Sequence, residues 1–164
     1  MIRPILVVGH PVLRQKAKRV SQIDRTLQQL IDDMIETMRA AGGAGLAANQ
    51  VSSLKRIAVA EVDHNPRYPY KPPIPLTVIV NPVLEPLADE TLLINEGCLS
   101  VPDLRGDLER YVSVRVRFID RQGSPQELIA GGLTAGTFQH EVDHLDGVLF
   151  LDRVADHHVD TQLG

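Results

Sequence analysis

The segment His140-Glu141-Val142-Asp143-His144 is the strongest indication of local structure in this sequence, because its two histidines can bind one metal ion if the segment is an α-helix. On an α-helix, positions four residues apart lie on the same face, so the two histidines can direct their imidazole nitrogens at one ion. Glu141 stands beside His140 and is then the candidate general base. The pattern predicts a metal-binding helix over Leu133 to Leu145; the alternative is a pair of solvated or core histidines.

Cys98 is the candidate for a third metal ligand. It is the single cysteine of the chain and lies in the segment Glu96-Gly97-Cys98-Leu99-Ser100. Three protein ligands leave one position of a tetrahedral site open, which distinguishes a catalytic centre from a closed structural one. One thiolate with two imidazoles suits Zn(II) and also accepts Fe(II), Co(II) or Ni(II). A lone cysteine is more often a small buried apolar residue, so only the two histidines favour the ligand role.

The composition indicates one soluble globular domain. The 164 residues are 43% hydrophobic and 23% charged, and the low aromatic fraction of 4% leaves Leu, Ile and Val to build the core. The net charge of -4 argues against broad nucleic-acid binding. No apolar run is long enough for a membrane span or the core of a signal peptide. We expect a single domain over residues 1–164, in the cytoplasm, without membrane contact and with no nucleic-acid site.

An amphipathic helix is predicted near the N-terminus, over Asp24 to Ala41. Ser21 or Asp24 can cap its start, and Gly42-Gly43 ends it. The apolar residues that recur at helical spacing are Leu27, Leu30, Ile31, Met34, Ile35 and Met38.

Strand-like segments occupy most of the remaining chain. They are Arg56 to Val62, Leu76 to Asn81, Thr91 to Asn95, Tyr111 to Asp120 and Gln126 to Ala130. Arg121-Gln122-Gly123-Ser124 is typical of a hairpin turn, and Gly131-Gly132 interrupts the last strand. Residues 64–75 hold five of the eleven prolines, which predicts an exposed loop. We expect an α+β fold with mostly antiparallel sheets around the C-terminal metal-binding helix.

Three segments together resemble, in order and spacing, the signature motifs of peptide deformylases. They are Gly43 to Gln50, Glu96 to Ser100 and Gln139 to Gly147. This family hydrolyses the N-formyl group from the N-terminal methionine of newly made polypeptides and releases formate. The resemblance spans nearly the whole chain and implies the same activity here. It also implies Fe(II) as the native ion, with Zn(II), Ni(II) or Co(II) possible in the purified protein.

The resemblance implies roles for the residues of the reaction. Glu141 is the base, while the side-chain amide of Gln50 and the backbone N–H of Leu99 donate to the developing oxyanion. Without the motif, Gln50 would be an ordinary hydrogen-bonding residue. Glu96 and Asp143 are expected to hydrogen-bond to the metal ligands and orient them.

The resemblance also implies a peptide-binding surface. The family pairs the substrate backbone with the first motif as an added strand, so Gly45 is expected to bond to the peptide. Gly97 is expected to touch the substrate too. Arg105 is expected to contact the peptide beyond the formyl-methionine.

The pocket for the methionine side chain is predicted on the helix face of His140. Thr137, Gly136 and Leu133 precede that histidine by three, four and seven residues. Gly136 stands where family members usually carry a larger apolar residue, and Ala44 replaces a typical Ile or Val. We expect a roomier and less selective pocket, unless neighbouring side chains refill the space.

Two other functions fit parts of the sequence. A metalloprotease uses the same helix but usually takes its third ligand downstream, where only His157 and His158 remain as histidines. A deformylase-like protein could instead bind N-termini without turnover, which the full set of ligands together with Gln50 and Glu141 disfavours. Some deformylases dock on the ribosome through a long basic C-terminal helix. Residues 154–164 are neither long nor basic, so ribosome contact is possible but lacks that element.

Overall fold

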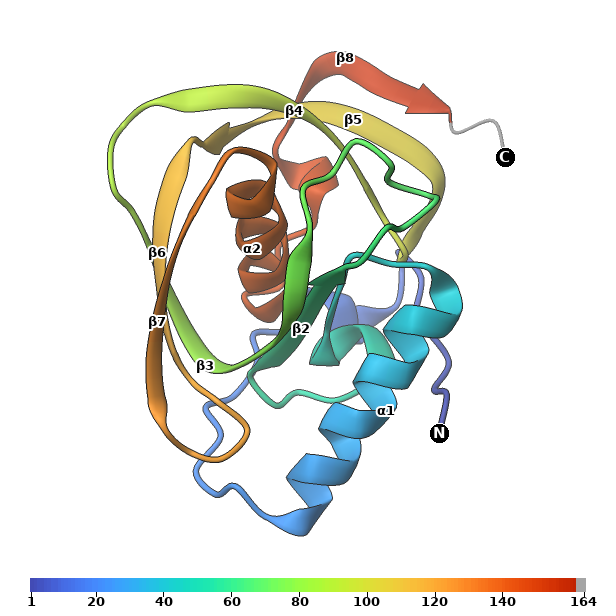
Figure 1. Ribbon diagram of the computed structural model, residues 1–164. Coiled ribbons are helices and arrows are strands. Elements are labelled where there is room, and N and C mark those ends of the chain that lie inside the picture. Colours follow the sequence, from blue (N-terminus) through green and yellow to red (C-terminus); the bar gives the residue numbers. More distant parts are fainter. Residues whose placement is uncertain (162–164) are drawn as a thin grey trace.

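Two antiparallel sheets form the framework of the protein (Figure 1). The computed structural model describes residues 1–161, and the side chains of residues 1–154. The larger sheet has the order β1-β2-β3-β6-β7, with bounds Gly45–Ala47, Ile57–Val62, Ile74–Pro86, Ser113–Ile119 and Pro125–Gly131. The smaller sheet has the order β4-β5-β8, with bounds Thr91–Cys98, Val101–Tyr111 and Val154–Thr161.

Helix α2, Gly132–Leu145, lies between the two sheets and contacts strands of both (Figure 1). Its apolar residues Ala135, Phe138 and Val142 pack into one core with the larger sheet. Ala58 and Ala60 of β2 belong to the same core, and their small side chains let the helix come close to the strand. The predicted α+β class, with antiparallel sheets and a C-terminal helix, is confirmed.

Helix α1, Arg25–Ala41, packs on the other side of the larger sheet. It begins where the Asp24 carboxylate accepts a hydrogen bond of 2.8 Å from the Leu27 N–H, and ends at Gly42, whose φ is 68°. Ile57 and Val59 of β2 point to this side, because successive side chains of a strand alternate between its faces. The two helices are therefore held at opposite faces of one sheet. The buried α1 residues are Leu27, Leu30, Ile31, Asp33, Met34, Ile35, Thr37 and Met38.

Three short 3-10 helices complete the described elements. They are η1, η2 and η3, with bounds Pro11–Arg14, Ala48–Val51 and Phe150–Asp152. In the part of the chain that the structure describes, no helix combines the length and the apolar character that crossing a membrane requires.

The strand predictions needed correction at several boundaries. Strand β3 runs from Ile74 to Pro86, well beyond the predicted Leu76 to Asn81. Strands β5 and β8 were not predicted at all, and Tyr111 belongs to β5 rather than to β6. The β5 sequence contains Pro, Gly, Asp and Glu, which have low strand propensity, so pairing with β4 and β8 decides its structure.

Asp24 is the residue that caps α1, so its replacement tests the helix start. We expect Asp24→Ala to lower the free energy of unfolding by about 1 kcal/mol, because the first-turn N–H loses its acceptor. Ser21→Ala, at the exposed alternative cap, should change it much less. Urea denaturation of both variants at equal metal content measures the difference. Equal losses in the two variants would contradict the assignment.

Candidate metal centre

The three predicted ligands meet beside α2. The sulfur of Cys98 lies 3.1 Å from Nε2 of His144, and the ligand atoms of Cys98, His140 and His144 all lie within 4.8 Å of one another. The imidazole ring centroids are 4.9 Å apart, as expected for neighbours one helical turn apart. Cys98 and His144 are buried, and the side chain of His140 is 11% exposed. This donor set fits a divalent transition-metal ion.

Glu96 orients His140. One oxygen of its carboxylate lies 2.8 Å from Nδ1 of the imidazole, which leaves Nε2 free for an ion. Arg110 donates two hydrogen bonds, of 2.7 and 2.9 Å, to the same carboxylate. Burial alone would raise the pKa of Glu96, but the hydrogen bonds from Arg110 and His140 outweigh it and lower the pKa to about 2. Glu96 is therefore an anion that fixes the orientation of a ligand.

Asp143 was expected to hydrogen-bond to a metal ligand, but its carboxylate is bonded to two arginines instead. Its carboxylate accepts a hydrogen bond of 2.7 Å from Arg110 and two, of 2.7 and 3.0 Å, from Arg153. Its link to the metal centre runs through Arg110 and Glu96. Arg110 is 3% exposed and was not anticipated from the sequence as a site residue.

Glu141 is buried against the backbone of β1. The Cα of Gly45 lies so close that a Cβ there would stand 2.7 Å from the carboxyl carbon of Glu141, which only glycine avoids. Oε1 of Glu141 is buried and has no hydrogen-bond partner among the described residues. Burial raises the pKa of Glu141 to about 7. A carboxyl group with this pKa can both take and return a proton near neutral pH.

Gln50, in η2, turns its amide toward Cys98. Its oxygen accepts the Ala47 N–H at 2.9 Å, so the NH₂ group faces the opposite way. That group donates to Oγ of Ser100 at 3.0 Å and lies 3.7 Å from the Cys98 sulfur. The backbone N–H of Ser100 also donates to the sulfur, at 3.4 Å. Ser100 therefore anchors both Gln50 and Cys98, a role that its place in the second motif did not reveal.

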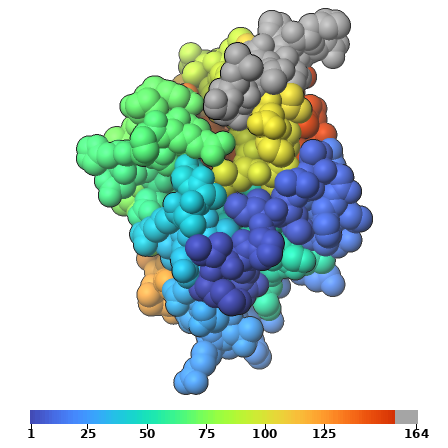
Figure 2. All heavy atoms as spheres, turned by 90° about the vertical axis from the view of Figure 1, so that its right-hand side faces the viewer, coloured from blue at the N-terminus to red at the C-terminus, as the bar shows by residue number. Residues whose placement is uncertain are grey.

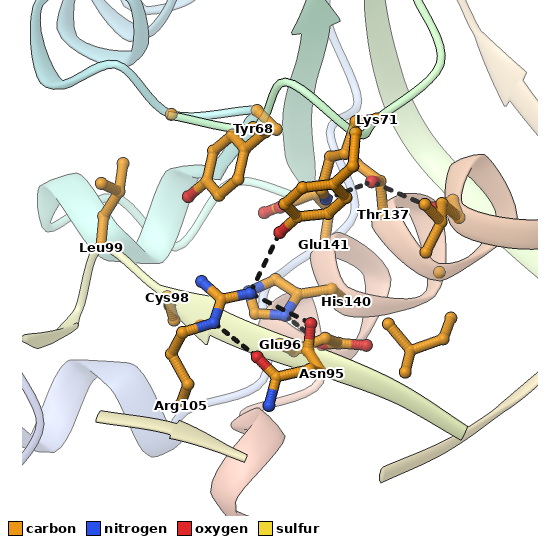
Figure 3. A pocket seen from close by; sticks show the side chains of 18 of the residues that line it. Tyr68, Lys71, Asn95, Glu96, Cys98, Leu99, Arg105, Thr137, His140 and Glu141 are labelled. Atoms are coloured by element: carbon orange, nitrogen blue, oxygen red, sulfur yellow. Dashed lines mark hydrogen bonds and ion pairs between the residues drawn. The ribbon is translucent and has the colours of Figure 1, made fainter. Parts of the chain in front are cut away.

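A pocket opens beside the ligands, and Figure 3 shows the side chains around it. All seven residues predicted to bind substrate line it: Ala44, Gly45, Gly97, Arg105, Leu133, Gly136 and Thr137. Leu99 also lines it, and its side chain packs over Gly43. Arg105 lies across Gly97 at the rim and donates to the side chain of Asn95 at 2.6 Å.

The space left by Gly136 is already filled. A Cβ at Gly136 would stand 2.9 Å from Cδ1 of Ile94, so this isoleucine from β4 occupies the volume of the missing side chain. Ala44 is 8% exposed and packs within the core. At Gly136 the structure matches the alternative, in which a neighbour refills the space, rather than an enlarged cavity.

The proline-rich segment 64–75 is largely exposed, as predicted, but it also forms part of the pocket wall. Tyr68 is 8% exposed and packs in the core, and Tyr68, Tyr70 and Lys71 line the pocket. Figure 2 shows this segment in green beside the yellow β4–β5 hairpin, where Arg105 donates to the Tyr70 hydroxyl at 3.3 Å. Two of the three tyrosines of the chain lie in this segment, a signal that could have revealed its contact with the core.

Comparison with known proteins gives consistent matches. The family model described as polypeptide deformylase matches residues 2–159. Peptide deformylase 2 of Nostoc sp. is 45% identical over 152 residues, which covers 92% of this chain and 85% of the relative. Peptide deformylase 1 of Corynebacterium efficiens is 46% identical over 156 residues, covering 93% and 87%.

Solved structures match equally well. The Met-Ala-Ser-bound class I type b peptide deformylase of Acinetobacter baumannii superimposes with a TM-score of 0.90 at 40% identity, over 94% of this chain and 99% of that one. The peptide deformylase of Synechococcus elongatus in complex with actinonin gives 0.85 at 42% identity, over 96% and 82%.

Removing the negative charge of Glu96 tests how the ligands are oriented. We expect Glu96→Gln to weaken Zn(II) binding by about 10- to 100-fold, because the imidazole of His140 loses its anionic acceptor. Glu109→Gln, an exposed glutamate of β5, is the matched control and should leave the affinity unchanged. Competition with a chromophoric chelator measures both. Wild-type affinity in the Glu96 variant would contradict the assigned role.

Proposed function

The chain belongs to the polypeptide deformylase family, and we propose that the residues gathered around the metal centre carry out that family's reaction. It is a metal-dependent hydrolase that removes the N-formyl group from newly made peptides. The observation that supports the residue roles is the placement of buried Glu141 over Gly45, in a pocket that Cys98 and His140 of the three-residue ligand group also line.

Cys98, His140 and His144 would hold the ion. When bound, a divalent metal supplies Lewis-acid chemistry: it polarises a carbonyl oxygen and makes water a stronger acid. We propose Fe(II) as the native ion, with Zn(II), Ni(II) or Co(II) as possible replacements in purified protein. The mixed thiolate and imidazole donor set supports this group of ions but does not select among them.

Glu141 moves the proton in the proposed reaction. Its carboxylate takes a proton from the attacking water, whose oxygen forms a bond to the formyl carbon. It then gives this proton to the nitrogen of the methionine as the C–N bond breaks. Formate and a free amino terminus are the products. The burial that raises the pKa of Glu141 to about 7 suits both transfers.

Gln50 and Leu99 stabilise negative charge on the formyl oxygen in this proposal. The Gln50 amide donates from its NH₂ group, and Leu99 donates from its backbone N–H. Ala47 and Ser100 hold the Gln50 amide at both ends, so the donor is oriented before the substrate arrives. An oriented donor needs no reorganisation as charge develops, which is why it lowers the barrier.

The peptide would lie along β1. This strand is at the edge of the larger sheet, so it can pair with an extended peptide backbone, and Gly45 lines the pocket. The first side chain would enter between Ala44 and the helix residues Leu133, Gly136 and Thr137. Gly97 and Arg105 would contact the peptide at the rim, next to Asn95.

The rival functions receive less support. Cys98 lies within ligand distance of the helix histidines, while the side chains of His157 and His158 are outside the described residues. Formate release from formyl-Met-Ala-Ser, with unformylated peptide left intact, distinguishes a deformylase from a metalloprotease and from a binding protein. We propose one catalytic unit over residues 1–164, acting in the cytoplasm. The C-terminal segment through Thr161 pairs as β8 with β5, so a ribosome contact through a basic helix has no support there.

Glu141→Gln separates metal binding from proton transfer. We expect the variant to keep its metal but to lose at least about 100-fold in formate release, because an amide cannot accept the proton. Metal analysis and a formate assay on the same sample measure the two properties. Glu90→Gln, at an exposed glutamate, is the control and should retain activity. Full activity in the Glu141 variant would exclude it as the base.

A pair of substitutions tests the oxyanion donor and its anchor. Gln50→Ala should lower kcat by about 10²- to 10³-fold, because a preorganised donor is removed. Ser100→Ala should cause a smaller loss, since Gln50 keeps its bond to Ala47. Steady-state kinetics with formyl-Met-Ala-Ser measures both, with Ser21→Ala as a surface control. A Ser100 variant as impaired as the Gln50 variant would point to damage at Cys98 instead.

A further inference from the structure

Lys71 brings an ammonium group into the pocket from the proline-rich segment. Its Nζ donates to Oγ1 of Thr137 at 3.2 Å and lies 5.1 Å from the centre of the Tyr68 ring (Figure 3). The Thr137 hydroxyl in turn donates to the carbonyl of Leu133, one helical turn earlier, at 3.3 Å. The cation therefore lies against the same face of α2 that lines the proposed pocket for the first side chain.

The ammonium group of Lys71 has N–H donors beyond the one that bonds to Thr137. A lysine carries three N–H donors, and the bond to Thr137 uses one of them. Among the side chains of residues 1–154, no carboxylate lies within 4.0 Å of the Lys71 ammonium, so none forms an ion pair with it. Glu96 and Glu141 attract it electrostatically only at longer range. Burial lowers the pKa of Lys71, which reflects the loss of water around the group. A partly desolvated donor of this kind favours an acceptor brought by a ligand.

The segment that carries Lys71 is held in place by several contacts. Asn65 donates to the carbonyl of Gly42 at 3.0 Å, and the N–H of Lys71 closes a turn onto the carbonyl of Tyr68 at 3.1 Å. Tyr68 is buried in the core, and the hydroxyl of Tyr70 accepts from Arg105 across the pocket rim. The ammonium position is thus defined before any ligand binds, which reduces the entropic cost of using it.

The rest of this wall is apolar. Ile94, Leu133 and Gly136 line the pocket next to Thr137, and Ile94 fills the space beside the glycine. A linear side chain can lay its methylene groups on this wall and direct its tip toward Lys71. The thioether of methionine is only a weak acceptor, whereas the oxygen of methionine sulfoxide is a polar acceptor that can use the free N–H donors.

We propose that Lys71 is a specificity-determining residue that lets the pocket accept N-formyl peptides whose first side chain ends in a hydrogen-bond acceptor, methionine sulfoxide in particular. The inference rests on the proposed placement of the first side chain against α2. Lys71 acts on the side chain and not on the reacting carbonyl, so its removal should alter the choice between substrates.

Three matched peptides test the proposal: formyl-Met-Ala-Ser, its methionine sulfoxide form, and formyl-norleucine-Ala-Ser, which has no acceptor. We expect the ratio of kcat/KM for the sulfoxide over the norleucine peptide to fall about tenfold in Lys71→Met, because a charged donor is lost. Lys71→Arg keeps a charged donor and should retain most of the ratio. Lys16→Met makes the same chemical change at an exposed lysine and should leave the ratio unchanged.

The outcomes separate this proposal from the reaction itself. A wild-type ratio in Lys71→Met, with formate still released from formyl-Met-Ala-Ser, would overturn the specificity role and leave the reaction standing. An equal loss on all three peptides would also overturn it, because a merely structural role predicts no change in the ratio. No formate from formyl-Met-Ala-Ser with metal-loaded wild-type protein would instead overturn the proposed reaction.

Discussion

Buried Arg110 forms ion pairs with Glu96 and Asp143, and these pairs tie the smaller sheet to helix α2. Glu96 is on β4, Arg110 on β5 and Asp143 on α2, so these ion pairs join the smaller sheet to the helix that carries the histidines. Charged groups at such depth are tolerated only when they are paired, and loss of one partner leaves the others uncompensated. Because Glu96 also hydrogen-bonds to His140, the same ion pairs that link the sheet to the helix orient a proposed metal ligand.

Close packing between backbone and side chains defines the other side of the site. The helix can press against the larger sheet because Ala58 and Ala60 are small, and Glu141 can reach its position because Gly45 has no side chain. The carboxyl group is thereby removed from water, and its pKa rises toward neutrality. One set of small residues thus serves both the packing of the fold and the chemistry of the proposed base.

The segment 64–75 shows what composition alone leaves out. Most of it is exposed, as its prolines indicate, yet Tyr68 anchors it in the core and Lys71 reaches helix α2. Its last two residues, Ile74 and Pro75, begin the central strand β3. Strand β5 shows the converse: its Pro, Gly and acidic residues disfavour a strand, but Arg105, Asp107 and Arg110 pair in register with residues of β4. In both cases the deciding contacts are with residues distant in the chain, which local sequence preference does not report.

The sequence alone predicts both helices and places His140, His144 and Glu141 together on one of them, because these features follow from residue type and spacing along a single element. Cys98 lies on β4, and its proposed ligand role came from the two histidines and from its motif. Two histidines four residues apart and the apolar repeat of α1 need no knowledge of the rest of the chain. The contacts of Arg110, Ser100, Lys71 and Ile94 are different. Each depends on a neighbour at least 14 positions away in the chain, such as Glu96 for Arg110, and such neighbours become known only when the chain has folded.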